Sequence, residues 1–159
     1  MFSERQTEII QVALELISEK GIQNLTIKNL SKKIGISEPA IYRHFNSKID
    51  ILIAILDSFT IKTKELFAKE LQLQTSALEK IEHLYTKHFE YLSDSPSVAT
   101  VLFSEEIFKN DDILIAKISA VINEKDKILQ QIISDGQKNG EITNKVDTDY
   151  LSTIIIGSL

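Results

Sequence analysis

The sequence predicts an all-α fold, and two observations support that prediction. Apolar residues recur every three or four positions along most of the 159 residues, which is the repeat of a helix with one buried face. The chain contains only 5 Gly and 2 Pro, whereas a β-sandwich or barrel needs more turn-forming residues. The length is sufficient for one compact core, or for a small module joined to a larger helical one.

Three short helices are expected in the first part of the chain, over residues 4–19, 26–34 and 37–46. The Thr26 hydroxyl can accept a hydrogen bond from a free N–H in the first turn of the second helix. Gly35 can adopt the left-handed conformation that ends this helix. A third helix follows after two residues, with Ser37 as its expected cap.

The remaining chain predicts five further helices, over residues 48–71, 76–95, 98–109, 111–138 and 147–159. Ser47 with Asp50, and Ser76 with Glu79, have the spacing of capping pairs. The last helix is still apolar where the sequence stops, and no stop signal precedes Leu159. We therefore expect the helical domain to be incomplete at this end.

Residues 26–48 have the layout of a helix-turn-helix, because two short helices flank a tight turn at residues 35–37. We expect a three-helix helix-turn-helix DNA-binding domain over residues 1–47. A helical ligand-binding and dimerisation domain is expected over residues 48–159. The alternative for the motif is a plain helical hairpin whose polar residues are simply solvated.

The third helix has two distinct faces on a helical wheel. Ile41 and Phe45 are four residues apart and face the core. Pro39 and Arg43 lie on the opposite side, and four residues form the flanks: Glu38, Ala40, Tyr42 and His44. The exposed face is small at its start and partly basic, which suits entry into a DNA major groove.

The side chains of this segment suggest roles at a DNA surface. Arg43 can read guanine with its two-pronged donor edge, and Pro39 and Ala40 offer apolar surface to a thymine methyl group. Polar side chains at the starts of helices, or beside the exposed face of the third helix (its reading face), can contact phosphates. The full set of candidate DNA-binding residues is Thr26, Lys28, Ser37, Glu38, Pro39, Ala40, Tyr42, Arg43, His44 and Lys48.

The charge distribution agrees with this assignment. The whole chain has a net charge of −5, which is unusual for a DNA-binding protein. Residues 24–48, however, contain five basic residues and a single acidic one, Glu38. A short basic segment on an acidic body predicts that one end of the protein binds DNA and the other binds something else.

The first fifty residues resemble the TetR family of regulators. The resemblance lies in the pattern of residues 10–21, the helix start at Thr26, and the run from Ile41 to Phe45 followed by Ser47 and Lys48. It implies that Tyr42, His44 and Lys48 hold the DNA backbone. It also implies a ligand pocket in the helical body, whose occupancy releases DNA. Ser31 departs from the family, which usually has Ala there.

The helical body is rich in aromatic residues, and two polar residues interrupt its apolar stripes. His88 and Glu105 follow apolar residues at helical spacing, and a buried polar group needs a partner. The candidate ligand-binding residues are Phe59, Phe67, Tyr85, His88, Phe89, Phe103, Glu105 and Phe108. The alternative is that the aromatics fill a core and that His88 is a hydrogen-bonded core histidine.

A homodimer is expected through the last two helices. The stripe on residues 112–138 consists of Ile118, Ile122, Leu129, Ile132, Ile133 and Gly136, and Ile154 and Ile155 would pair with it. The resemblance implies such a four-helix contact. The alternative for each residue is ordinary packing within one chain.

The sequence features bear on three classes of function. The preferred one is a sequence-specific DNA-binding regulator, a repressor released from its operator by a small, mainly apolar ligand. The alternative is a DNA-binding protein without a small ligand, controlled by a protein partner or acting architecturally. An enzyme is not expected, since no glycine-rich phosphate loop, metal motif or nucleophile–base pair is recognisable.

The sequence also indicates the surroundings in which the protein works. With no Cys and no signal-peptide pattern, we expect a cytoplasmic protein with no membrane segment. No cofactor and no metal are expected, because His83 and His88 are wrongly spaced for one helical face. The expected partners are a double-stranded operator, a small-molecule effector and a second copy of the chain.

Overall fold

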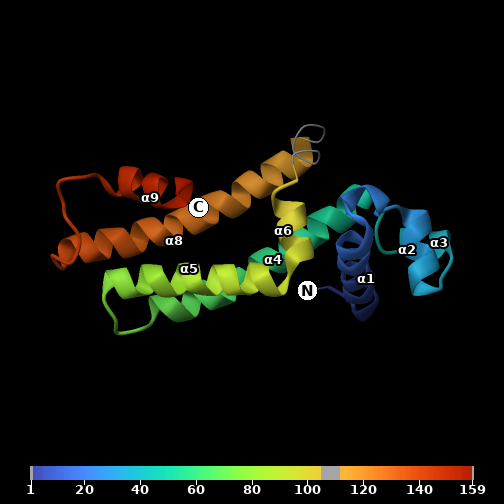
Figure 1. Cartoon of the computed structure of the whole chain (residues 1–159), viewed down its shortest axis with the longest axis horizontal. Coiled ribbons are helices and arrows are strands. Elements are labelled where there is room, and N and C mark those ends of the chain that lie inside the picture. Colours follow the sequence, from blue (N-terminus) through green and yellow to red (C-terminus); the bar gives the residue numbers. More distant parts are fainter. Residues whose placement is uncertain (1, 105–111, 159) are drawn as a thin grey trace. The chain divides into compact units, whose positions relative to one another are not determined.

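A computed structural model describes residues 2–104 and 112–158, apart from the side chains of Leu66 and Glu70. Every regular element among these residues is a helix, as the sequence predicted (Figure 1). The elements are α1 (Glu4–Lys20), the 3₁₀ turn η1 (Ile22–Asn24), α2 (Ile27–Ile34), α3 (Glu38–Tyr42), α4 (Lys48–Leu71), α5 (Ala77–Asp94), α6 (Pro96–Leu102), α8 (Asp112–Lys138) and α9 (Thr148–Gly157).

The described residues form two compact units. Unit 1 draws on Met1–Phe59 and Leu92–Ile118, and unit 2 on Thr60–Tyr91 and Ser119–Leu159. Helices α4, α5 and α8 therefore each contribute to both units. The expected boundary between residues 47 and 48 remains a prediction. Over the described residues, no helix is long and apolar enough to span a membrane.

The short helix α2 begins and ends where the sequence predicted. The Thr26 hydroxyl oxygen accepts a hydrogen bond from the Asn29 backbone N–H at 3.1 Å. Gly35 ends the helix in the left-handed conformation, with φ at +81°. Ser31 is buried and its hydroxyl donates to the Lys28 carbonyl oxygen. This internal bond satisfies the hydroxyl, so a serine fits where a small apolar residue would otherwise pack.

Helix α3 is shorter than predicted, because it ends at Tyr42 and not at Asn46. The His44 backbone N–H bonds to the Ile41 carbonyl oxygen, which tightens the last turn to the three-residue spacing of a 3₁₀ helix. Ser37 is the N-cap residue of α3, as predicted, although its side chain accepts no cap hydrogen bond. Arg43 keeps right-handed angles, so it continues the reading face.

The core of unit 1 is formed by α1, α2, α3, the first half of α4, α6 and the start of α8. Ile41 is fully buried and Phe45 is 6% exposed, which confirms that they are the core-facing pair of α3. Helix α6 begins at Pro96, two residues earlier than predicted, because Pro fits the first turn of a helix where no N–H is needed. It contributes the buried Val101 to this core.

In unit 2, α5 and α8 run antiparallel. Ala77 at the start of α5 lies against Gly136 near the end of α8. His88, later in α5, lies against Lys125, which is earlier in α8. The predicted Ser76–Glu79 capping pair is present, with both reciprocal backbone bonds. The Glu141 carboxylate accepts a hydrogen bond from the Ala77 backbone N–H. This bond satisfies a free N–H at the start of α5.

The apolar stripe of α8 is largely covered within the chain itself. The buried members are Ile118, Leu129, Ile132, Ile133 and Gly136, whereas Ile122 is 48% exposed. On α9, Ile154 is 63% exposed and Ile155 is half-buried. Intrachain packing therefore accounts for most of the stripe that the sequence offered as a dimer contact.

Gly136 supplies a test of the α5–α8 packing. A Cβ at this position would lie 2.6 Å from the Ala77 Cβ and 2.9 Å from the Ile142 Cδ1. We expect Gly136→Ala to destabilise the protein by about 1–3 kcal/mol, because overpacking outweighs the gain of about 1 kcal/mol in helix propensity. The matched control is Gly157→Ala on α9, where a Cβ meets nothing within 4 Å. Chemical denaturation that finds equal effects for both variants would contradict this packing.

Candidate nucleic-acid interface and effector site

The outer face of α3 presents the side chains that the sequence assigned to DNA. Pro39, Tyr42 and Arg43 are exposed, and so are Ser37 and Glu38 at the start of the helix. Ala40, His44 and Lys48 are half-buried. The exposed side chains come from a segment that is anchored on its inner side, so they form a defined surface and not a loose loop.

Three hydrogen bonds that involve side chains hold the C-terminal end of residues 37–46, the reading segment, and the start of α4. The Gln6 side-chain N–H on α1 donates to the His44 carbonyl oxygen at 3.4 Å. After the segment, the Ser47 hydroxyl accepts from the Asp50 N–H, and the Asp50 carboxylate accepts from the Asn46 N–H. The bonds among Asn46, Ser47 and Asp50 cap the start of α4, which confirms the predicted Ser47–Asp50 capping pair.

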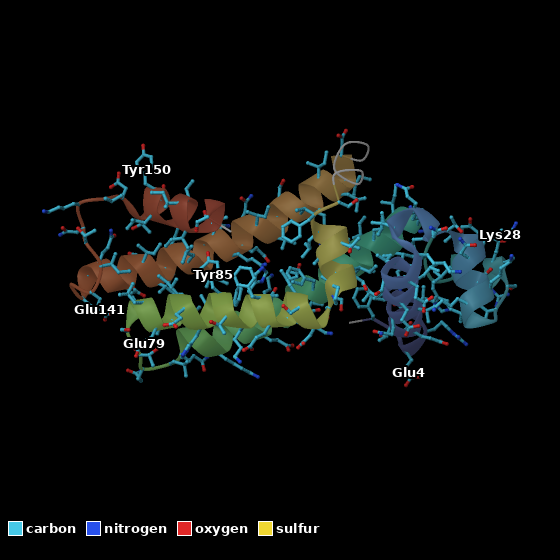
Figure 2. All side chains as sticks on the ribbon, in the orientation of Figure 1. Glu4, Lys28, Glu79, Tyr85, Glu141 and Tyr150 are labelled. Carbon is cyan, nitrogen blue, oxygen red and sulfur yellow. The ribbon has the colours of Figure 1, made fainter. Side chains whose placement is uncertain are left out.

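The basic side chains of this region are not equivalent. Lys33 lies 2.6 Å from the Glu19 carboxylate of α1, which holds the pKa of Glu19 below its ordinary value. Lys28 is exposed on α2 and extends away from the helix (Figure 2). The Lys48 ammonium donates to the Ile22 carbonyl oxygen at 3.2 Å, and an ammonium has three donors. Lys28 and Lys48 are therefore better placed for phosphates than Lys33.

The candidate ligand-binding residues are distributed over both units. Phe59 is buried in unit 1, and Phe67 is buried in the core of unit 2. Phe89 is 49% exposed and Phe103 is 72% exposed, so neither of them lines an enclosed site in this structure. Glu105 and Phe108 lie outside the described residues. Tyr85 and His88 are half-buried on one face of α5.

The structure pairs His88 with a residue that the sequence analysis missed. The Lys125 Nζ on α8 lies 3.3 Å from the His88 Nδ1. Burial and the nearby Lys125 lower the pKa of His88 to about 4, so its ring is neutral at pH 7 and can accept this bond. Lys125 is four residues from both Val121 and Leu129. This helical spacing among apolar residues could have identified Lys125 from the sequence as an inward-facing polar residue.

Two more polar side chains adjoin this pair. The Tyr85 side chain extends from α5 toward α8 (Figure 2). Burial and the negative charge of Asp126 raise the pKa of the Tyr85 hydroxyl. Asp126 follows Lys125 on α8, and its Oδ2 accepts a hydrogen bond from the Gln130 side chain at 2.8 Å. Tyr85, His88, Lys125 and Asp126 thus form one polar layer between the two helices.

Small cavities adjoin the same helices. One cavity of about 10 Å³ lies between α4 and α8 and is lined by Thr60, Phe67, Ile128 and Lys125 among others. A second, of about 60 Å³, lies near the start of α5 beside Gly136 and Glu141. Drug-sized ligands occupy pockets of about 300–1,000 Å³. A ligand larger than a few water molecules would have to open either cavity.

Burial of Lys125 gives a pH-dependent contribution to stability. Burial lowers its pKa from 10.5 to about 8 in the folded protein. The unfolded chain therefore binds more protons between pH 8 and 10.5, and stability conferred by this side chain rises across that window. We expect wild type to gain stability relative to Lys125→Met as the pH is raised from 8 to 10.5. Parallel denaturation curves for the two proteins across this range would show that the amine titrates normally.

Comparison with known proteins identifies both parts of the chain. Residues 9–55 match the family described as bacterial regulatory proteins, tetR family. Residues 58–159 match the family described as the C-terminal region of YsiA-like protein. Together these matches extend over nearly all of the sequence, including the segment that carries the helix-turn-helix.

Individual relatives agree with these matches. The fatty acid metabolism regulator protein of Bacillus subtilis is 27% identical over 152 residues, which are 96% of this chain and 78% of that protein. The nucleoid occlusion factor SlmA of Mannheimia succiniciproducens is 21% identical over 96% of this chain and 71% of its own. The crystal structure of the regulator FadR from Bacillus subtilis in complex with stearoyl-CoA superposes with a TM-score of 0.83 at 26% identity, covering 96% of this chain and 81% of that one. The chain therefore belongs to the TetR family and is a DNA-binding transcriptional regulator.

Proposed function

We propose that this protein is a repressor that binds its operator through α3 and is released by an effector with a long acyl chain. The single observation that carries the proposal is the similarity, over 96% of the chain, to a regulator whose structure contains stearoyl-CoA. The similar Bacillus subtilis protein is also described as a regulator of fatty acid metabolism.

On the DNA side, Arg43 reads a guanine edge in the major groove, while Pro39 and Ala40 contact apolar base surface. Tyr42, His44, Lys48, Thr26 and Lys28 hold phosphates on either side of the groove. The exposure of Tyr42 and Arg43 and the anchoring of their neighbours Ile41 and Phe45 support this division of roles. Ser37 and Glu38 lie at the N-terminal end of α3, which is the end that enters the groove.

On the effector side, the acyl chain enters the helices of unit 2 near Phe67 and the polar layer of Tyr85 and His88. The cavity beside Phe67 is small, so the ligand must separate α4 from α8 to enter. Helix α4 is one continuous helix that begins at Lys48, beside the reading segment. A displacement of its second half is thereby transmitted toward the DNA-binding end.

Release follows only if the ligand binds the DNA-free arrangement more tightly than the DNA-bound one. A ligand with equal affinity for both arrangements would shift nothing, however tightly it bound. An opening of α4 from α8 meets this requirement, provided that the opened arrangement holds the reading helices at a spacing that DNA cannot accept.

The protein is further proposed to act in the cytoplasm as a homodimer through α8 and α9. Ile122 on α8 and Tyr150 and Ile154 on α9 are largely exposed apolar side chains that a second copy would cover. A two-fold dimer would place two α3 helices about 34–36 Å apart, which is one turn of DNA, or at a multiple of that distance.

A second function is favoured by a different relative. The similarity to a nucleoid occlusion factor shows that relatives of this fold are not all regulators of metabolism, and the alternative is a DNA-binding protein controlled by a protein partner or acting architecturally. In that case the small cavities of unit 2 would never open, and the polar layer would serve only to align α5 with α8.

Operator reading by α3 is tested by comparing Arg43→Ala with Lys48→Ala. We expect Arg43→Ala to lose about 1–3 kcal/mol of discrimination between operator and random DNA, because it removes a base contact. Lys48→Ala should weaken binding to both DNAs equally and flatten the salt dependence by about one unit of slope, because it removes a phosphate contact. Lys145→Ala in unit 2 is the control. Equal losses on both DNAs for Arg43→Ala would make Arg43 a backbone contact instead.

Effector release is tested by adding stearoyl-CoA to the protein–operator complex. We expect stearoyl-CoA to dissociate the complex at micromolar concentration, with free coenzyme A at the same concentration as the control, because the acyl chain supplies the apolar surface that opens unit 2. Fluorescence anisotropy of labelled operator measures both. An operator complex that survives saturating stearoyl-CoA would exclude this effector and favour control by a protein partner.

A further inference from the structure

The first turn of α1 contains a glutamine whose side-chain amide makes two different hydrogen bonds. The Gln6 Oε1 accepts a bond from the Ser3 backbone N–H at 3.0 Å, and the Ser3 hydroxyl oxygen accepts one from the Gln6 backbone N–H at 3.2 Å. These reciprocal bonds are the capping box of α1. A glutamate at the same position would form the same box, so the cap by itself does not require an amide.

The nitrogen of this amide bonds to the reading segment. The Gln6 Nε2 donates to the His44 carbonyl oxygen at 3.4 Å, 38 residues further along the chain. This bond needs an N–H donor, and a glutamate carboxylate has only acceptors to offer. Gln6 is half-buried, so water competes with the bond less than it would at an exposed site.

The carbonyl group that Gln6 holds lies where α3 ends and where its own hydrogen bonds run out. The His44 N–H donates to the Ile41 carbonyl oxygen at 2.9 Å, but the last carbonyl groups of a helix have no partner within it. Two residues later, the Asn46 N–H donates to the Asp50 carboxylate of α4. Phe45, between them, is buried. The exit from α3 is therefore fixed by α1 and by α4.

We infer that Gln6 is a positioning residue for operator recognition. Its amide fixes the backbone of His44, and through that backbone it sets the orientation of Arg43 and of the His44 side chain. The inference rests on the proposed function, in which α3 reads the operator. It adds a residue from outside the helix-turn-helix of residues 26–48, and this residue contributes to recognition without touching DNA itself.

Such a role affects operator DNA more than random DNA. Binding to random DNA comes from the attraction between basic side chains and phosphates, which tolerates small movements of the reading face. Base reading requires side chains held within about 0.5 Å of the productive geometry. Without the bond, the segment spends part of its time in other arrangements, and the apparent affinity for operator falls with the competent fraction.

Two substitutions of Gln6 separate its two bonds. Gln6→Glu keeps the acceptor for Ser3 and removes the donor to His44. Gln6→Lys removes that acceptor and supplies an ammonium donor. Fluorescence anisotropy measures affinity for the operator duplex that wild type selects from random sequences, and for a random duplex at the same salt concentration. The ratio of the two affinities removes the uniform effect of an added charge on DNA binding.

We expect Gln6→Glu to lower the ratio about 3–10-fold, since one hydrogen bond is lost, and Gln6→Lys to keep it. Gln6→Met removes the same donor without adding charge and should lower the ratio equally. The matched control is Gln11→Glu at an exposed position of α1, which should leave the ratio unchanged.

Chemical denaturation gives the second readout. Gln6→Glu should be as stable as wild type because it keeps the capping box, whereas Gln6→Lys should be less stable. A wild-type ratio for Gln6→Glu would overturn the inference. A low ratio confined to Gln6→Lys would also overturn it, because the cap of α1 would then be what matters. If Arg43→Ala lowers the ratio and Gln6→Glu does not, only this inference fails. If wild type selects no sequence, the proposed operator reading fails with it.

Discussion

Helix α3 depends on the burial of Ile41 and Phe45. It has five residues, and an isolated helix of that length is unstable in water because its nucleation cost is never recovered. Its stability comes from the two apolar side chains that enter the core of unit 1, where Ile41 is fully buried. Removal of that anchor would leave Tyr42 and Arg43 on a flexible loop, and every role assigned to the reading face presupposes a fixed geometry.

The DNA-binding end of this acidic protein carries basic residues of two kinds, those paired with acidic residues and those that are not. Lys33 is held by Glu19 on α1, so one basic residue of the segment is used to fasten α2 to α1. Exposed ion pairs of this kind contribute little stability, but they remove a charge from the field that DNA would meet. The positive charge of the segment then comes from Lys28, Lys32, Arg43 and Lys48, for which no ion pair is found among the described residues.

In unit 2, the interface between α5 and α8 combines a close apolar contact with a polar one. At one end, Gly136 lets the α8 backbone lie against Ala77, and the helices pack as closely as the chain permits. Near the middle of α8, Lys125 and His88 make a polar contact between the same helices. A buried polar group is costly unless it is hydrogen-bonded, so this contact depends on the bond between Lys125 and His88.

The sequence by itself determined the features that depend on neighbouring residues. The Thr26 cap, the left-handed Gly35, the Ser76–Glu79 box and the inward-facing pair on α3 were all predictable, because each arises from contacts within one turn. The tertiary structure decided the rest. The Gln6 bond to the His44 carbonyl oxygen and the pairing of Lys125 with His88 join residues 38 and 37 positions apart. Helical periodicity marks Lys125 as inward-facing, but it cannot say which helix Lys125 meets, because that choice is made only when α5 and α8 pack.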